Sequence, residues 1–245
     1  MKRSFLSLAL VVPLTLVDVV DNGRQTSPID FNKDLQQDTE NPPPPEPTHP
    51  TERDPLCMDT PPMAVRPIES DRLLTISQQP TFLIYFPYTS EAIGYGTLKI
   101  QDRTQSDTIY QSQFQLPETP GFLSVTANLP TGTLQQGEYY RWFVQFDVEC
   151  IPTGELEVET KTVTLLGWVR RLEATSDRRF SIEAGEPDIW YGSLARLAEL
   201  RRNNPNNITL QEQWDTLLQL TNSDKLEAVA GEPILDPATI VEDND

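Results

Sequence analysis

The sequence is poor in the residues on which many enzyme chemistries depend. It has one histidine and two cysteines among 245 residues. Nucleophilic Ser-His-Asp and Cys-His triads need a positioned histidine, and His49 lies in a proline-rich stretch that offers it no partners. There is no Cys/His cluster with zinc spacing and no glycine-rich phosphate-binding loop. The sequence therefore predicts no catalytic residue, no metal site and no cofactor.

Positive charge is also scarce, with 19 Lys and Arg residues against 37 Asp and Glu residues and a net charge of −18. A field of this sign repels phosphate backbones and anionic lipids, so neither nucleic acid nor a membrane surface is an expected partner. A glycoside hydrolase with two catalytic carboxylates is the enzyme class that composition leaves open. Even so, Glu155, Glu157 and Glu159 are typical of the solvent side of a strand.

Long apolar runs are missing except at the N-terminus. Lys2 and Arg3 precede an apolar run over 5–17, which is too short to span a bilayer and is typical of a secretory signal peptide. We assign residues 1–20 to this signal. No A-x-A cleavage motif follows, so non-standard cleavage and an uncleaved N-terminal anchor stay open. The expected location is periplasmic or extracellular.

Residues 21–67 are acidic and rich in proline, and we expect a disordered linker that holds a folded domain away from a surface. A polyproline ligand for an aromatic groove is the alternative. Cys57 lies in this linker and Cys150 lies in the following domain. In an oxidising compartment such a pair is usually a disulfide, with two free buried thiols as the alternative.

The pattern becomes β-rich after the linker. Val, Ile, Thr, Tyr and Phe dominate short segments separated by turn residues, without helices between them. We predict a mainly β fold with a C-terminal α segment, in which residues 68–171 form a seven-stranded antiparallel immunoglobulin-like β-sandwich. The expected strands cover 72–77, 81–87, 95–102, 107–116, 121–129, 139–150 and 157–170.

The stretch from Leu134 to Cys150 is the clearest of these segments. Leu134-x-x-Gly137-x-x-Tyr140 has the spacing of a tyrosine corner, in which a Tyr at the start of a strand hydrogen-bonds back across the preceding turn. Trp142 follows on the same face as Tyr140. We expect Trp142 to be a core residue, with a sugar-stacking platform as the alternative.

Residues 172–235 predict a helical hairpin packed on the sandwich. An irregular segment or short helix comes first, and a helix over about 187–201 ends before Asn203. The capping-box pattern from Thr209 to Glu212 predicts a second helix over 210–220, and the same signal from Asp224 to Glu227 predicts a short third helix. We expect residues 236–245 to be a disordered acidic tail.

Arginines stand out near the end of the predicted sandwich. The candidate partner-binding residues are Arg170, Arg171, Arg178 and Arg179, which would recognise an anionic partner. The alternative is local pairing of the arginines in this part of the chain with nearby glutamates.

Several short motifs, in order, are similar to a known family. They are Leu-Thr at 74–75, Pro-Thr-Phe-x-x-Tyr-x-Pro at 80–87, Tyr-x-Trp at 140–142, Gly-Trp-Val-Arg at 167–170, Ile-Trp-Tyr at 189–191, Leu-Ala-x-Leu-Arg at 197–201 and Trp-x-x-Leu-Leu at 214–218. Together they resemble the cyanobacterial exported family called domain of unknown function 928, over roughly residues 62–230. The resemblance implies an exported protein and supplies no catalytic residues. Residues 222–230 depart from the more apolar ending of that family.

These observations favour a non-enzymatic exported module that binds a protein or glycan partner at the cell envelope. A hydrolase acting on envelope glycans through paired carboxylates is one alternative, and a structural spacer is the other.

Overall fold

We analysed a computed structural model of the chain, which describes residues 60–88, 92–150 and 157–241. Contacts divide the chain into units 1–40 and 41–245, and every described residue belongs to the second. The predicted signal peptide, most of the predicted linker, His49, Cys57 and residues 242–245 lie outside the described residues. Among the described residues, no helix has the length and apolar character needed to cross a membrane.

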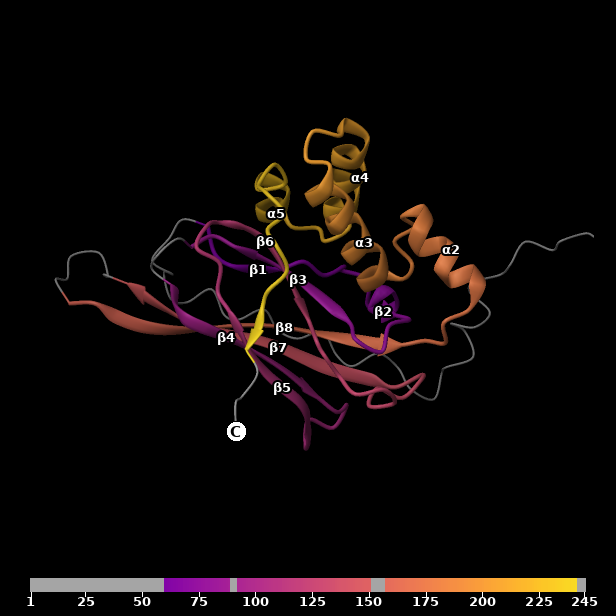
Figure 1. Ribbon diagram of the computed structural model, residues 1–245, viewed down its shortest axis with the longest axis horizontal. Helices are drawn as coiled ribbons and strands as arrows, with labels where there is room; N and C mark the ends of the chain where they lie inside the picture. Colours follow the sequence, from indigo (N-terminus) through magenta and orange to yellow (C-terminus); the bar gives the residue numbers. More distant parts are fainter. Residues whose placement is uncertain (1–59, 89–91, 151–156, 242–245) are drawn as a thin grey trace, which may run out of the picture. The chain divides into compact units, whose positions relative to one another are not determined.

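The described chain is mainly β with a C-terminal helical segment, as predicted (Figure 1). The seven predicted strands correspond to seven observed ones with closely similar bounds. These are β2 (Leu74–Thr75), β3 (Thr81–Phe86), β4 (Ala92–Gln101), β5 (Thr108–Gln115), β6 (Gly121–Thr126), β7 (Tyr139–Cys150) and β8 (Glu159–Arg171). Two short strands were not predicted, namely β1 (Met63–Ala64) and β9 (Ile240–Val241).

The strands form two sheets of unequal size. The small sheet has the order β1-β3-β6, and the large sheet has the order β2-β8-β7-β4-β5-β9. β2 pairs with β8 in parallel, so the large sheet is mixed. The structure therefore does not confirm the predicted seven-stranded, fully antiparallel immunoglobulin-like sandwich. The parallel pair arises because the chain enters through a 3-10 turn, η1 (Ser70–Arg72), and then runs beside the end of β8.

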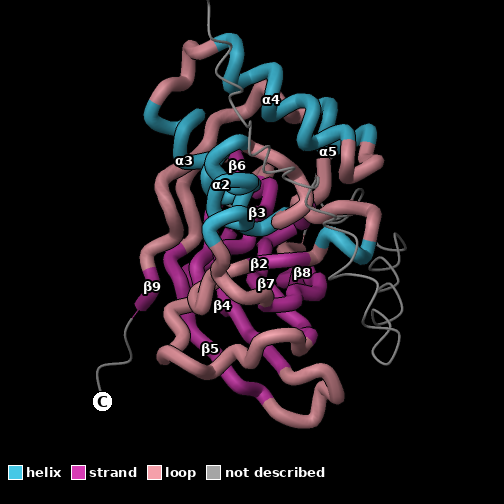
Figure 2. Tube along the Cα trace, turned by 90° about the vertical axis from the view of Figure 1, so that its right-hand side faces the viewer, coloured by secondary structure: helices cyan, strands magenta, loops and turns pink. Residues whose placement is uncertain are grey.

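β3 of the small sheet lies between the large sheet and the helices, while α3 also packs against β2 and so reaches the large sheet (Figures 1 and 2). This position explains why β3 is apolar on both faces. Phe82 and Phe86 contact the large sheet through Trp142 and Phe146, while Tyr85 contacts Phe122. Strands covered on both faces are expected to be continuously apolar.

The long ladder between β7 and β8 supports the core between the two sheets. The two strands pair antiparallel from Tyr139 opposite Arg170 to Cys150 opposite Glu159. Alternate β7 side chains are buried, as the period-two pattern predicted: Tyr140, Trp142, Val144, Phe146 and Val148. Because the β8 backbone carries Gly167 opposite Trp142, the indole has room; a Cβ there would lie 2.7 Å from the ring.

Four helices follow the sheets: α2 (Ser176–Ala184), α3 (Trp190–Asn203), α4 (Ile208–Gln219) and α5 (Asp224–Ala228). The predicted capping boxes were wrong in detail. Asn207, not Thr209, caps α4 by accepting a hydrogen bond from the Leu210 amide at 3.2 Å. Ser223 caps α5 in the same way. In both places a good N-cap residue lies just upstream of the predicted one.

Both ends of the described chain are more ordered than predicted. Residues 60–67 were assigned to the disordered linker, but Met63 and Ala64 pair with β3 and Val65 is buried. Residues 236–241 were assigned to a disordered tail. Instead, the segment 233–241 runs along β6, with hydrogen bonds that include Ala238 to Ser124, and ends as β9 beside β5. Half-buried apolar side chains of this segment pack on the core. The acidic residues of the segment therefore did not indicate disorder up to residue 241.

Candidate functional site

Arg170 and Arg171, two of the four predicted partner-binding residues, are parts of the framework at the end of β8. Arg170 is 8% exposed, and its Nε donates a hydrogen bond to the Gly137 carbonyl at 2.8 Å. Its guanidinium lies 5.3 Å from the centre of the Tyr139 ring. Burial lowers the pKa of Arg170. On the next residue, Arg171 Nη1 donates to the Leu134 carbonyl at 2.8 Å.

Both arginines therefore hold the corner at 134–140. Within it, the Tyr140 hydroxyl accepts a hydrogen bond from the Gln135 amide at 2.8 Å, which confirms the predicted tyrosine corner. Gly137 has a φ of +84°, a left-handed conformation that glycine adopts without strain. Its amide donates to the Arg171 carbonyl at 2.8 Å. Each of the two arginines thus donates at least one of its hydrogen bonds to a backbone carbonyl inside the protein.

The other two predicted residues lie on α2. The Arg178 amide is capped by Thr175, and its guanidinium donates to the Glu173 carbonyl at 3.1 Å. Arg179 is exposed. Their role in binding an anionic partner stays a prediction.

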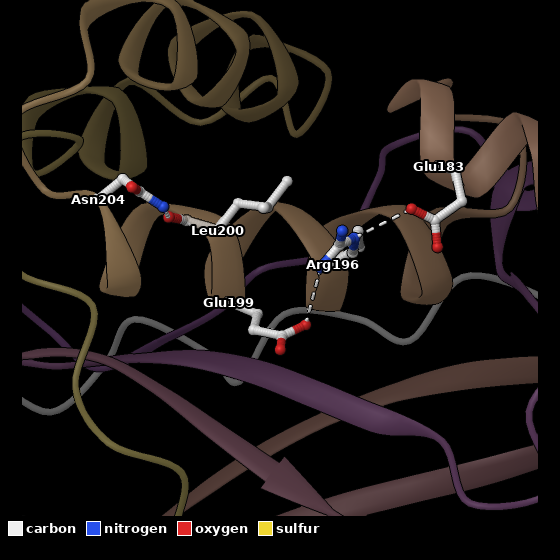
Figure 3. A network of polar contacts seen from close by, with 5 residues as sticks. All are labelled: Glu183, Arg196, Glu199, Leu200 and Asn204. Atoms are coloured by element: carbon white, nitrogen blue, oxygen red, sulfur yellow. Dashed lines mark hydrogen bonds and ion pairs between the residues drawn. The ribbon is translucent and has the colours of Figure 1, made fainter.

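Local pairing occurs at another arginine of this region. Arg196 of α3 lies 3.3 Å from a carboxylate oxygen of Glu183 in α2 and 3.2 Å from one of Glu199 (Figure 3). Farther along α3, the Asn204 side chain donates to the Leu200 carbonyl at 3.0 Å. Only the pair with Glu183 joins α2 to α3, and because both ion pairs are largely exposed each contributes little to stability.

Trp142 is a core residue, as predicted, and its side chain is fully buried. Its Nε1 donates to the Tyr191 hydroxyl at 3.0 Å, and that hydroxyl donates to the Trp168 carbonyl at 2.6 Å. Burial raises the pKa of Tyr191, so the hydroxyl stays protonated. This chain of hydrogen bonds joins α3 to β7 and β8. It leaves Trp142 unavailable for stacking on a sugar.

A surface groove with a volume of about 240 Å³ lies in the helical segment. We call it the α4 groove. One wall is the connection from α2 to α3, with Gly185 and Pro187. The other wall is a stripe along the whole of α4, made of Thr209, Glu212, Gln213, Thr216, Leu217 and Leu220. These positions recur every three or four residues, so they share one helix face.

Two devices fix the walls of the α4 groove. Gly185 ends α2 in the left-handed conformation, with a φ of +77°, and turns the chain towards α3. Ile182 then packs where Gly192 of α3 has no side chain, and the Ser193 hydroxyl donates to the Glu186 carbonyl. The first wall is therefore tied to α3 on both sides of the turn.

A buried arginine holds the second wall. Arg201 of α3 is 7% exposed, and its Nη2 donates to the Gln211 side chain at 2.5 Å. Gln211 in turn donates to Asp215 at 2.6 Å. The Arg201 guanidinium also lies 5.0 Å from the centre of the Trp214 ring. Burial lowers the pKa of Arg201, while Asp215 opposes that shift. This network fixes α4 against α3.

The α4 groove has few side chains of the kinds that catalysis uses. Glu212 is the one carboxylate among its lining residues, whereas a two-carboxylate hydrolase needs two facing carboxyls. In the part of the chain that the structure describes, no group of three His, Cys, Asp or Glu side chains could hold a metal ion. The chemistry that the lining offers is contact with apolar groups, hydrogen bonding and one negative charge.

Sequence reasoning missed this groove. It placed Trp214, Leu217 and Leu218 on the inward face of α4, and all three are buried. One signal in the sequence could have indicated the groove: Leu217 and Leu220 lie at the edge of the inward face of α4, next to Thr, Glu and Gln residues. The opposing wall comes from another part of the chain, and local patterns do not predict it.

Comparison with known proteins identifies the family. The family model described as Domain of Unknown Function (DUF928) matches residues 49–234, which is more than half of the chain. The chain belongs to this family. The DUF928 match covers both sheets up to β8, the four helices and the α4 groove, and it ends before β9. No curated protein and no solved structure shows significant similarity to the chain.

Proposed function

We propose that this DUF928 protein is a non-enzymatic binding module of the cell envelope, and that its α4 groove receives a segment of a partner protein. The observation that carries the proposal is the groove itself, an open surface feature whose walls are fixed by contacts with α3 and whose lining is partly apolar. Concave surfaces with apolar floors and a few polar groups are the usual form of binding sites.

The lining favours a protein over a glycan. No aromatic ring lines the α4 groove, whereas Thr, Gln and Leu side chains do. Sugar recognition commonly relies on stacking against aromatic faces, and the buried Trp142 does not provide one. Apolar and hydrogen-bonding side chains along one helix suit a peptide segment.

The proposal includes an exported location and a disulfide between Cys57 and Cys150. The basic start and short apolar run of residues 1–17 support export. Cys150 is the last residue of β7, so a bond to Cys57 would tie the chain that precedes β1 to the end of the longest strand ladder. On the chain-entropy model, closing a loop of this length stabilises by roughly 4–5 kcal/mol. Detection of both cysteines as free thiols in exported material would refute the bond.

The function is tested by affinity purification from envelope extracts with the full chain as bait. Thr216→Arg fills the centre of the α4 groove with a long charged side chain from an exposed position. The matched control is Gln219→Arg, which makes a similar change at an exposed α4 position outside the groove lining. We expect a protein partner that both the wild type and Gln219→Arg retain and that Thr216→Arg loses. Equal retention by all three baits would contradict the proposal.

A further inference from the structure

The α4 groove carries information about the chemistry of its partner, beyond the fact of binding. It is elongated, since its α4 wall runs from Thr209 to Leu220. At the rise of an α-helix this distance is about 16 Å. An occupant of this length is about three helical turns or five extended residues. The groove therefore suits a short segment with repeating contacts.

The floor is apolar at one end. Leu217, Leu220 and Pro187 contribute to it. The Ile68 amide donates to the Leu220 carbonyl at 3.2 Å, and Ile68 is 49% exposed. An exposed isoleucine whose backbone meets the end of α4 is covered favourably by apolar groups of a partner. The occupant is thus expected to bring apolar side chains to this end.

The charges on the rim are negative and unneutralised. Glu212 lies in the α4 wall, and Glu186 and Asp188 flank Pro187 of the opposite wall. All three residues are exposed, and none forms an ion pair with a described residue. No lysine or arginine lines the groove. This contrasts with Glu183 and Glu199 nearby, which share Arg196.

From the apolar floor and the unpaired acidic rim, we propose that the α4 groove binds a cationic amphipathic segment of a partner protein, with apolar side chains on one face and Lys or Arg beside them. The inference rests on the proposed binding function and adds the partner's chemistry. Complementary charge at the rim raises the association rate and selects against acidic segments, while the apolar contacts hold the complex.

Two synthetic peptides test the proposal against the full chain. Both have 14 residues with leucines at helical spacing; one has lysines at the polar positions and the other has glutamates. Fluorescence anisotropy should show that the lysine peptide binds at least tenfold more tightly than the glutamate peptide. Thr216→Arg should weaken lysine-peptide binding at least tenfold, and Glu212→Lys at least fivefold.

A matched charge change separates the groove from the general acidity of the protein. Glu227→Lys alters an exposed glutamate on α5, outside the groove lining, and should change lysine-peptide binding less than twofold. If Glu227→Lys weakens binding as much as Glu212→Lys, the attraction is non-specific and the proposal is overturned. If Thr216→Arg unfolds the chain by circular dichroism, Gln213→Arg replaces it at another exposed lining position.

The remaining outcomes distinguish the chemistry from the binding function. If the glutamate peptide binds more tightly than the lysine peptide, and Thr216→Arg weakens its binding, the cationic specificity is overturned and the binding function stands. Self-association that Thr216→Arg abolishes in sedimentation velocity would assign the groove to a second copy of this chain and overturn the proposal. Insensitivity of every peptide and every envelope partner to Thr216→Arg would overturn both.

Discussion

The end of β8 and the face of α4 both carry conspicuous charge, but they use it differently. At β8, Arg170 and Arg171 donate hydrogen bonds to carbonyl groups of the 134–140 corner. At α4, Glu212 is exposed and makes no ion pair with a described residue. The comparison teaches that charge in the sequence does not by itself indicate a free surface, because the fold decides which polar groups are used inside the protein.

The largest effect on stability should come from Arg170, which makes two contacts at the end of β8. Arg170→Ala removes the hydrogen bond to the Gly137 carbonyl and the contact with the Tyr139 ring. A hydrogen bond from a charged donor at a buried position contributes about 2 kcal/mol, so the free energy of unfolding should fall by about that amount. Urea unfolding of the full chain measures it. A loss below about 0.5 kcal/mol would show that Arg170 is not part of the framework.

A smaller loss is expected at the corner that these arginines hold. Tyr140→Phe removes the acceptor of the Gln135 amide and leaves the ring in place. The predicted loss of unfolding free energy is about 1 kcal/mol. The control is Tyr95→Phe, because Tyr95 is 55% exposed and makes no hydrogen bond through its hydroxyl that the structure records. Equal effects of the two substitutions would contradict the tyrosine corner.

The smallest effects on stability are expected at exposed charges. Arg179→Glu and Glu212→Lys each change an exposed residue, and both should alter the unfolding free energy by less than about 0.5 kcal/mol. They should differ in binding, because Glu212→Lys weakens the partner complex and Arg179→Glu does not. If Arg179→Glu abolishes partner binding and Glu212→Lys does not, the partner binds at the arginine-rich region and not at the α4 groove.

The sequence predicted the parts of this fold that depend on local patterns. Period-two alternation located β7, and the spacing of Leu134, Gly137 and Tyr140 located its corner. The sequence did not predict β1 or β9, because each is two residues long and pairs with a strand that is distant along the chain. A two-residue strand has no period to detect.

The charged positions show the same limit. Arg170 and Arg171 are candidate partner-binding residues because they stand out in an acidic background, and that role stays a prediction. Their contacts with residues 134 and 137 depend on β8 running beside the start of β7, which composition does not show. The α4 groove was missed because its two walls come from residues that are 22 to 35 positions apart along the chain. Burial and pairing of charges are decided by the tertiary fold.

The most direct test of this account places a photo-crosslinking amino acid at Gln213, in the groove lining, or at Arg179, on α2, in the full chain within its native envelope. Both positions are exposed, so both tolerate the replacement. The account predicts a discrete crosslinked partner from position 213 and none from position 179, with the attached partner peptide containing Lys or Arg beside apolar residues. A discrete partner from position 179 and none from position 213 would contradict it.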